Sequence, residues 1–570
     1  MKINSNKKIN LLVIFFLILY SFLINYYFGF QGFNFVDSFQ HIAGGEKIVA
    51  GEVPFKDYWI SDSGPLMDFV QGLLFNIFGK SWNVLVLNSS LINIIFTLTI
   101  FWLCNILELP LIPKIIFPVL SATVMYPASG TPLIDFHSLI ISVFGLTYFI
   151  FLIKNNDFKK MIIIPMIFII AFFFKQVPSA YFAIIILFIS IYYFFKQKRE
   201  ILYSQFFGSV IGLIITFLIL YFLNIEIEKV YEQFFLMPIS QLTERGIDQT
   251  IDTSFFSTSQ KIRYVVFLLI PSIVVLYNLL KSKKKISDVS IINLIIIFGL
   301  FTTGILHESY TLNQSTTLGI LPLISVFLLT FSNIKDRKLE FILYAINLVI
   351  ILRLIKLDIN YLILFIILVF AFIYFKNKFF VYNKFRILLV SYTILTTIFY
   401  FDKLIINRKW QDIYNPNWRQ DSIDASKIDY KLKGLRWVSN DPDTKKEFFV
   451  VEENLKYLKN SASEGNYILI THYQIYNMVL NQNNFSPVKY WWKNASFPLD
   501  NKILKNKFDK TFLEKIEKNK VKRIIVLKDV KIYEKFNIKY FQWLIECSIL
   551  DKKNSNSFRE VYKIVSKCKI

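Results

Sequence analysis

The chain has 570 residues, of which 54% are apolar, 18% aromatic and 18% charged, and its mean hydropathy is +0.47. Soluble globular proteins carry about 25% charged residues, so this composition excludes a disordered chain, a collagen-like fibre, a disulfide scaffold and a single soluble domain. The net charge of +23 would favour a nucleic-acid partner. The basic residues, however, form short clusters between apolar stretches of about 20 residues, which indicates a polytopic helical membrane protein that binds no nucleic acid.

A bilayer core of about 30 Å requires roughly 20 helical residues. About thirteen apolar segments of suitable length precede residue 402. The first segment is too long for a signal peptide and has no small-residue cleavage site, so it is predicted to remain as a membrane span. The predicted cores are residues 10–29, 84–104, 114–127, 137–153, 161–174, 178–195, 205–224, 264–280, 288–305, 315–332, 339–353, 359–375 and 387–401.

Basic clusters predict the orientation of these spans. Lysines precede the first span, and further clusters recur in alternate loops, at residues 154–160, 196–199, 281–285, 335–338 and 376–386. The positive-inside rule makes their side cytoplasmic. The loop 105–113 belongs to the same side but has no basic cluster. The N-terminus is therefore predicted to be cytoplasmic, and the C-terminal tail to be periplasmic or external.

Two domains are predicted, a transmembrane domain over residues 1–401, with a long first outer loop at 30–83, and an external α/β domain over residues 402–570. The apolar runs 467–472 and 522–528 are predicted to be buried strands. Helical patterns occur around 446–459 and 508–518, and residues 547–550 and 560–565 are predicted to form a hairpin. No phosphate-binding glycine loop accompanies these strands, so no nucleotide-sugar site is expected in the tail.

The three cysteines carry little information. Cys104 lies in or near a span, whereas Cys547 and Cys568 lie in a compartment that permits disulfides. A hairpin centred near residue 554 would not place these two residues opposite one another. Pairing and free thiols both stay open, with two free thiols favoured.

The first outer loop contains the densest set of polar residues. Asp37 follows the first span within a few residues, so it is expected at the membrane face. Residues 37–50 are predicted to form a helix, which places His41 one turn from Asp37 on the same helix face. A second helix is predicted to begin at a proline and to cover residues 66–78, up to a glycine. The loop is therefore predicted to be structured and to lie along the membrane interface.

Further polar residues mark the outer ends of other spans. Asp135 lies at the start of one predicted span, and Lys175 lies at the outer end of another. A carboxylate at the interface can accept the proton of an acceptor hydroxyl as that oxygen attacks a sugar C1. A cation such as Lys175 or a histidine can neutralise a phosphate leaving group on a lipid carrier. One further short outer loop contains His307, Glu308 and Tyr310.

Each of these candidates has a simpler interpretation. A polar residue at a span end is by default a solvated interface residue, and a lysine there extends its charge towards water. His41, His137 and His307 show no paired-ligand spacing, so satisfied interface histidines are favoured over a metal site. The aromatic residues 58–59 and 490–492 can stack on sugar rings or form an interfacial belt.

The architecture and the first outer loop together resemble the C-type integral-membrane glycosyltransferases, close to the protein O-mannosyltransferase and aminoarabinose-transferase relatives. The resemblance is carried by Gly51-Glu-Val-Pro-Phe-Lys-Asp57-Tyr-Trp, then Gly64-Pro-Leu66, then Leu74-Phe-Asn-Ile-Phe-Gly79. Asp37 and Asp135 sit where the family has its first and second acidic residues. Many relatives have a carboxylate directly after the first acid, where this chain has Ser38, and this departure leaves the acceptor class open.

The resemblance implies an inverting transfer from a polyprenyl-phosphate sugar, without a nucleotide and without a required metal cofactor. Asp37 would be the general base, and Asp135 would orient the acceptor or support the base. Lys175 and His307 would lie near the carrier phosphate. The remaining substrate-binding candidates are His41, Asp57, Glu308 and Tyr310, although Asp57 has the alternative role of shaping the turn after Pro54.

The predicted function is therefore that of a glycosyltransferase in the plasma (inner) membrane, with a lipid, glycan or protein acceptor on the periplasmic or external face. The abundance of Phe, Ile, Lys and Asn suggests a bacterial source. A diphosphate-glycan ligase or oligosaccharyltransferase is the alternative enzyme. A flippase for lipid-linked sugars is the alternative from another class, and it would place ionisable residues within the spans and show inverted repeats.

Overall fold

The computed structural model describes residues 2–60, 64–106, 108–195 and 197–239 and, in the C-terminal part, residues 398, 401–408, 411, 413, 415, 417–439, 441, 443–492, 496–528 and 538–569. The predicted spans from residue 264 to residue 401 lie outside the described residues, apart from Ile398 and Phe401. The candidate site residues His307, Glu308 and Tyr310 lie outside them as well.

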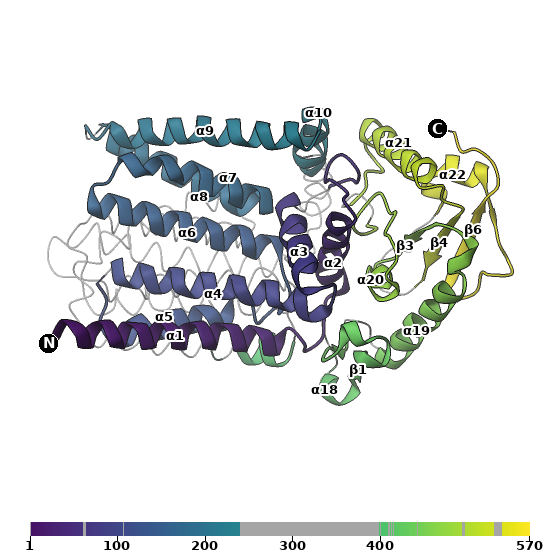
Figure 1. Ribbon diagram of the computed structural model, residues 1–570, viewed down its shortest axis with the longest axis horizontal. Helices are drawn as coiled ribbons and strands as arrows, with labels where there is room; N and C mark the ends of the chain where they lie inside the picture. Colours follow the sequence, from purple (N-terminus) through teal and green to yellow (C-terminus); the bar gives the residue numbers. More distant parts are fainter. Residues whose placement is uncertain are drawn as a thin grey trace, which may run out of the picture.

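Every predicted span before residue 225 is a helix, and these helices run side by side in one bundle (Figure 1). A short 3-10 helix at Lys159–Ile162 precedes α7, and the short helix α10 (Ile227–Val230) and a π turn at Tyr231–Leu236 follow α9. The bundle helices are α1 (Lys2–Phe28), α4 (Trp82–Ile106), α5 (Leu111–Val124), α6 (Ile134–Asn155), α7 (Ile163–Phe174), α8 (Gln176–Phe195) and α9 (Glu200–Phe222).

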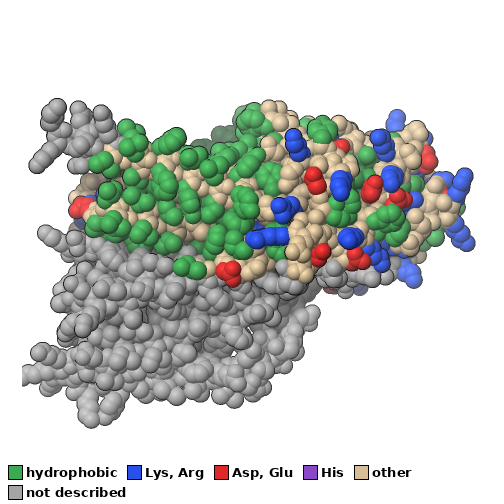
Figure 2. Space-filling view, turned by 90° about the horizontal axis from the view of Figure 1, so that it is seen from below, with side chains coloured by type: hydrophobic (Ala, Val, Ile, Leu, Met, Phe, Trp, Pro, Cys, Tyr) green, Lys and Arg blue, Asp and Glu red, His purple; other side chains and the backbone are tan. Residues whose placement is uncertain are grey.

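Among the described residues, four helical stretches are long and apolar enough to cross a bilayer, namely Ile9–Phe28, Trp82–Ile106, Ile134–Asn155 and Glu200–Phe222. Their outer surfaces are apolar; α1 exposes side chains such as Leu12 and Phe15, and α9 exposes Phe206, Leu213 and Phe217. Figure 2 shows hydrophobic side chains spread over the bundle, whereas Lys, Arg, Asp and Glu gather over the C-terminal domain. This distribution identifies an integral membrane protein.

The predicted basic loops lie together at one end of the bundle. The Lys154 Nζ donates to the Ile106 carbonyl at 2.6 Å, and the Lys198 Nζ donates to the Asn156 Oδ1 at 3.2 Å. The loops 105–113, 154–160 and 196–199 are therefore neighbours. The N-terminus is at the same end, opposite to the C-terminal domain (Figure 1). The predicted alternation of loops is confirmed for the part of the bundle that the structure describes.

The first outer loop forms a layer between the bundle and the C-terminal domain (Figure 1). It contains the two predicted helices, α2 (Phe35–Val49) and α3 (Pro65–Phe78), which are steeply inclined to the bundle helices. They pack closely because glycines line the contact. A Cβ on Gly45 would lie 2.8 Å from the Gln71 Cγ, and one on Gly72 would lie 2.6 Å from the Ile48 Cβ. The layer is therefore a rigid platform over one end of the bundle.

The C-terminal domain contains a four-stranded sheet in the order β3-β4-β6-β5. The strands β3 (Tyr467–Ile470) and β4 (Arg523–Leu527) are parallel, and their side chains are fully buried, as the apolar runs predict. The helices α19 (Thr444–Asn460) and α21 (Lys502–Lys518) confirm the predicted helical patterns. The antiparallel strands β5 (Ser548–Leu550) and β6 (Arg559–Ile564) confirm the predicted hairpin. Shorter elements are α18 (Trp418–Asp421), β1 (Ile423–Asp424), β2 (Arg436–Trp437), α20 (Tyr476–Leu480) and α22 (Gln542–Cys547).

The preference for two free thiols in the tail is wrong, because Cys547 and Cys568 form a disulfide. Ser548 pairs with Ile564, so the hairpin is centred near residue 556, two residues beyond the predicted centre. The Val565 backbone N–H then donates to the Cys547 carbonyl. The chain curls back within the next three residues, and the two Cα atoms are 5.0 Å apart.

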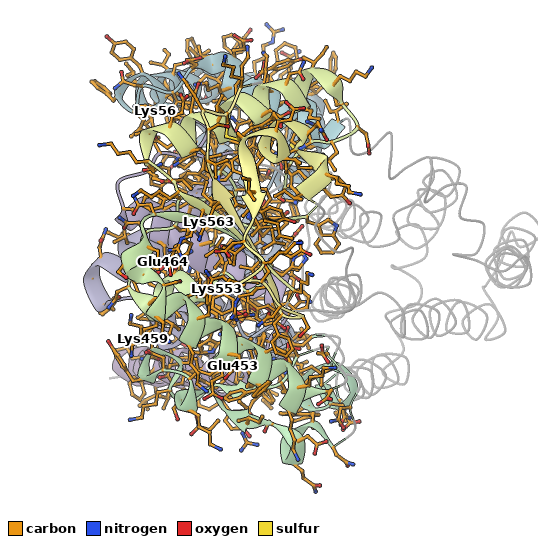
Figure 3. The ribbon with its side chains drawn as sticks, turned by 90° about the vertical axis from the view of Figure 1, so that its right-hand side faces the viewer. Lys56, Glu453, Lys459, Glu464, Lys553 and Lys563 are labelled. Carbon is orange, nitrogen blue, oxygen red and sulfur yellow. A yellow bond between two sulfur atoms is a disulfide. The ribbon has the colours of Figure 1, made fainter. Side chains whose placement is uncertain are left out.

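The first outer loop and the C-terminal domain share a hydrophobic core. Phe33, Phe35 and Phe39 of the loop pack with Trp437 and Tyr473 of the tail. The Arg436 backbone N–H donates to the Phe30 carbonyl at 2.9 Å. The opposite face of the domain is charged, and Figure 3 labels several of its side chains there, namely Glu453, Lys459, Glu464, Lys553 and Lys563. The tail is therefore anchored on the platform, with a solvated outer face.

Candidate functional site

Asp37 lies in the first turn of α2, at the end of the bundle that the platform covers. The Asn34 side chain caps this helix by accepting from the Asp37 backbone N–H at 3.3 Å. A carboxylate in the first turn is favoured by the helix dipole. The neighbouring Ser38 Oγ shares a hydrogen bond of 2.9 Å with the Thr131 Oγ1, which joins α2 to the loop before α6. Asp37 is half-buried at this junction.

Asp135 and Lys175 lie at the same end of the bundle as Asp37. Asp135 is in the first turn of α6, four residues after Thr131, and is half-buried. Lys175 is the C-cap of α7, and its carbonyl accepts from the Ser138 Oγ, one turn along α6 from Asp135, at 2.8 Å. The structure thus brings Asp37, Asp135 and Lys175 onto elements that contact one another directly.

The loop between α5 and α6, which links these elements, is held from three sides. The buried Arg408 donates from Nη1 to the Pro127 carbonyl at 3.0 Å, and the Ser89 Oγ donates to the Gly130 carbonyl at 2.8 Å. The Gln411 amide donates to the Ser129 carbonyl. Burial lowers the pKa of Arg408 to about 9. No sequence pattern pointed to Arg408, which supports the loop from a position 281 residues away.

His137 belongs to a buried hydrogen-bonded chain that links α6 to α3. Its Nε2 contacts the Asn88 Oδ1 at 3.2 Å, and the Asn88 Nδ2 donates to the Gln71 Oε1 at 2.9 Å. Its Nδ1 contacts the Tyr126 hydroxyl. His137 is therefore a satisfied histidine, as the simpler interpretation predicts.

His41 is completely buried, and neither ring nitrogen has a hydrogen-bond partner in the described part of the chain. Burial lowers its pKa well below the usual range, and the charges of Lys489 and His137 add to the effect. His41 is therefore neutral at pH 7. The interpretation of a satisfied interface histidine is wrong for this residue.

Asp68 and Lys489 form a buried ion pair between the platform and the tail, at an Oδ1–Nζ distance of 3.0 Å. The exposed fractions of the two side chains are 0% and 1%. The Tyr58 hydroxyl donates to the Asp68 Oδ2 at 2.8 Å. Burial raises the pKa of Asp68, whereas Lys489 and this hydroxyl oppose the rise. Sequence reasoning missed this pair, because a single sequence does not show which residues meet across 421 positions.

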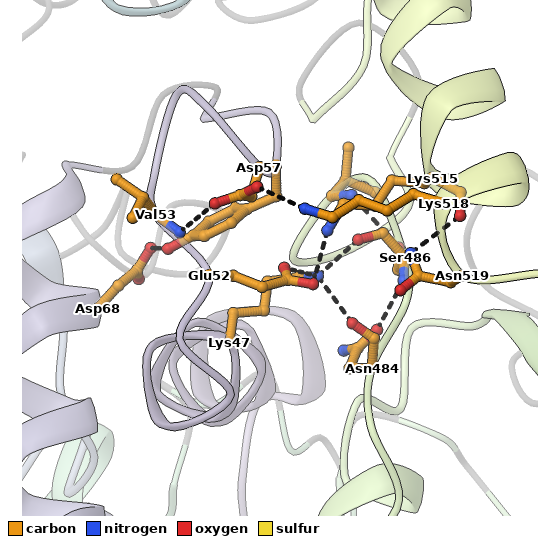
Figure 4. Close-up of polar contacts among 12 residues, drawn as sticks. Lys47, Glu52, Val53, Asp57, Asp68, Asn484, Ser486, Lys515, Lys518 and Asn519 are labelled. Atoms are coloured by element: carbon orange, nitrogen blue, oxygen red, sulfur yellow. Dashed lines mark hydrogen bonds and ion pairs between the residues drawn. The ribbon is translucent and has the colours of Figure 1, made fainter. Parts of the chain in front are cut away.

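A second group of ion pairs joins the platform to the tail (Figure 4). The Lys47 Nζ lies 3.1 Å from the Glu52 Oε2 and donates to the carbonyls of Asn484 and Ser486. The Lys515 Nζ lies 2.6 Å from the Glu52 Oε1. Burial lowers the pKa of Lys515 to about 8. Glu52 thus binds one lysine from each side of the interface.

Asp57, a predicted substrate-binding residue, shapes the turn and also contacts the tail. Its Oδ2 accepts from the Val53 backbone N–H at 2.9 Å, and its Oδ1 lies 3.3 Å from the Lys518 Nζ (Figure 4). Burial alone would raise the pKa of Asp57, but these two contacts lower it overall. In the structure Asp57 therefore stabilises the turn after Pro54, which was the alternative role predicted for it.

The conspicuous aromatic residues of both segments are packed inside the protein. Tyr58 and Trp59 are buried, as are Tyr490 and Trp491, and Trp492 packs against the shared core. The Trp59 Nε1 donates to the Met237 Sδ at 3.0 Å. The four buried residues form neither a lipid-facing belt nor a free stacking surface, so both predicted roles are wrong for them.

Glu46, on the same helix as Asp37, is a buried carboxylate with distant counter-charges. It is 3% exposed, and its nearest described cation is the Lys80 Nζ at 3.8 Å. Burial raises its pKa to about 8, although Lys80, Lys47 and Lys431 oppose the rise.

We expect Glu46→Gln to remove part of the pH dependence of stability. An unfolded Glu titrates near a pKa of about 4.3. The folded group, with a pKa of about 8, binds more protons in between, so wild-type stability should fall as the pH rises towards about 8. The unfolding midpoints of wild type and variant should agree below about pH 4 and diverge in favour of the variant by about pH 9. The exposed Glu108→Gln is the control, and a gap independent of pH would contradict this account.

Within the described residues, no group of three or more His, Cys, Asp or Glu side chains could hold a metal ion. The question of a metal at His307 or Glu308 falls on residues outside that part. The described platform instead offers carboxylates, lysines and neutral polar groups, which suit hydrogen bonding and proton transfer.

No protein-family model and no curated protein matches the sequence. Among solved structures, the chain is similar to ArnT from Cupriavidus metallidurans bound to undecaprenyl phosphate, with a TM-score of 0.39 and 11% identity over 97% of this chain and 98% of that one. It is also similar to ArnT from the same organism in the apo state, with a TM-score of 0.36 and 10% identity over 98% of each chain. A TM-score below 0.5 does not establish a shared fold, so the function proposed for this chain rests on its own residues.

Proposed function

We propose that the protein is a membrane glycosyltransferase that moves a sugar from a polyprenyl-phosphate carrier to an acceptor at the periplasmic or external face. The observation that carries this proposal is the placement of Asp37, Asp135 and Lys175 on contacting elements at one end of an apolar bundle, beneath the platform and the tail. A lipid carrier can reach this end from the bilayer, and a polar sugar can remain under the platform.

In the proposed reaction, an acceptor hydroxyl oxygen attacks C1 of the sugar from the face opposite to the phosphate. The bond between C1 and the phosphate oxygen breaks, and the configuration at C1 inverts. Asp37 takes the hydroxyl proton, and Asp135 orients the acceptor. Lys175 stabilises the charge that develops on the departing lipid phosphate. The proton thus ends on Asp37, the sugar on the acceptor oxygen, and the bonding electrons on the lipid phosphate.

The flippase alternative has less support from the described spans. A transporter for a charged lipid carrier would be expected to place ionisable residues inside its membrane helices. Within the described bundle helices, no Asp, Glu, Lys or Arg side chain is buried, and the buried polar residues are mostly Asn, Ser and Thr. Asn25 and Asn93, for example, join neighbouring helices by hydrogen bonds. These contacts are typical of helix packing.

We expect Asp37→Asn to reduce sugar transfer about 10²-fold or more, because the amide cannot accept the proton. The measurement is transfer from a radiolabelled polyprenyl-phosphate sugar in proteoliposomes. Asp157→Asn, at the opposite end of the bundle, is the matched control and should retain wild-type transfer.

Equal transfer by wild type and Asp37→Asn would make Asp37 an interface residue and Asp135 the next candidate. If neither protein transfers sugar but labelled lipid crosses the bilayer, the flippase function replaces the enzyme.

A further inference from the structure

A cluster of buried polar groups lies beside Asp37 and has hydrogen-bonding capacity that the described protein does not use. His41 is one helical turn after Asp37 on the same face of α2 and has two unpartnered ring nitrogens. Gln71 on α3 uses its Oε1 to accept from Asn88, but its Nε2 has no partner in the described part of the chain. Both side chains are 0% exposed. Buried polar groups normally have partners, so this cluster is built for a ligand or an ordered water.

The glycine contact between α2 and α3 brings the two helices that carry His41 and Gln71 close together. His41 precedes Gly45 by one turn, and a Cβ on Gly45 would meet Gln71. A Cβ on Gly44 would clash with the Asp68 Oδ1 and would lie 3.1 Å from the Lys489 Cδ. The ion pair of Asp68 and Lys489 thus closes the same region from the tail.

The chemistry of the cluster matches a neutral hydroxyl group better than a phosphate. Lys489 is already paired with Asp68, so the described cluster presents no uncompensated cation. A neutral imidazole offers one donor and one acceptor, and the Gln71 Nε2 offers a further donor. Burial keeps His41 in that neutral form by lowering its pKa, and the positive charge of Lys489 adds to the effect.

We infer that His41, together with Gln71, forms the subsite that recognises hydroxyl groups of the sugar on the lipid carrier. This inference rests on the proposed function. One helical turn advances about 5.4 Å, a span that one monosaccharide covers. A sugar whose C1 lies near Asp37 therefore presents its far hydroxyls at His41, and His41 acts as a specificity residue, separate from the phosphate contact at Lys175.

The test is equilibrium binding of purified protein to undecaprenyl phosphate and to its esters with glucose, mannose, galactose and arabinose. We expect wild type to bind at least one ester more tightly than the bare lipid phosphate. His41→Ala should weaken binding of that ester about 10-fold, with less than a two-fold change for the bare lipid. His41→Gln should recover part of the loss, because an amide also supplies a donor and an acceptor. The matched control is His472→Ala, which removes a histidine of the tail.

Equal weakening of ester and bare lipid by His41→Ala would overturn the inference, as would no change in either, which would indicate that the cluster holds only water. It would also be overturned if wild type bound no ester more tightly than the bare lipid. The proposed function is judged separately by the transfer assay, so a failure of the subsite can be distinguished from a failure of the function.

A second measurement tests the inference on the wild-type protein, in case His41→Ala fails to fold. The chain has four histidines, so ¹⁵N-histidine labelling gives few ring signals, and the His41 signal is the one absent from His41→Gln. That signal should shift with the bound ester and not with undecaprenyl phosphate. A shift with both, or with neither, would contradict the assignment.

Discussion

Lys489→Met is expected to destabilise the protein by about 3–5 kcal/mol, because it leaves the Asp68 carboxylate buried without its counter-charge. The pair is almost completely buried, at 3.0 Å, so water cannot replace the lost cation. Among the described residues, the hydrogen bond from the Tyr58 hydroxyl and the more distant charge of Lys47 remain to stabilise the carboxylate. The measurement is the unfolding midpoint in mild detergent, followed by tryptophan fluorescence.

The matched control is Lys518→Met, which breaks the ion pair with Asp57. Lys518 is 71% exposed, and a solvated pair of this kind contributes about 0–1 kcal/mol. The double variant Asp68→Asn with Lys489→Met should regain part of the loss, because it removes the uncompensated charge as well. If Lys489→Met and Lys518→Met behave alike, the buried pair does not hold the tail on the platform.

Removal of the disulfide between Cys547 and Cys568 is expected to have the second large effect. The bond closes a loop with a sequence separation of 21 residues. By the chain-entropy estimate, a loop of this size contributes about 3 kcal/mol to stability. A variant with serine at both positions should unfold at a lower temperature than wild type, and dithiothreitol should shift wild type but not the variant.

Thiol counting provides an independent check of the bond and of the predicted orientation. The chain has three cysteines, and in the structure only Cys104 is free. Denatured but unreduced protein should therefore bind one equivalent of a thiol reagent, and reduced protein three. Three equivalents before reduction would contradict the disulfide and would also remove support for a tail in an oxidising compartment.

Local sequence patterns predicted the elements of the fold well. The proline and glycine that bound α3, the apolar runs of β3 and β4, and the apolar stretches of the bundle each act within a few residues. Signals of this kind can therefore be recognised in a single sequence. The placement of Asp37, Asp135 and Lys175 at one end of the bundle followed from the alternation of spans and basic loops.

The partners within the candidate site could not be predicted in the same way. Lys489 meets Asp68, and Arg408 meets the loop before α6, across separations of 421 and 281 residues. Their sequence neighbours give no sign of these contacts. The aromatic residues beside Lys489 suggested a surface role, yet the shared core buries Tyr490. The hairpin was recognised, but its register alone places Val565 opposite Cys547, and the approach of Cys568 depends on the return of the chain beyond the last strand, which no local pattern indicates.

The common core of the first outer loop and the tail limits how this protein can be recombined with others. Phe33 and Phe39 of the loop pack against Trp437 and Tyr473 of the tail. The Lys47 Nζ donates hydrogen bonds to two carbonyls within residues 484–486. A chimera that exchanges the tail alone would expose the apolar residues of the loop. It would also leave Lys47 and Asp68 without their partners in the tail. Chimeras that exchange residues 30–83 together with the tail keep both halves matched, so loop and tail form the natural unit of exchange.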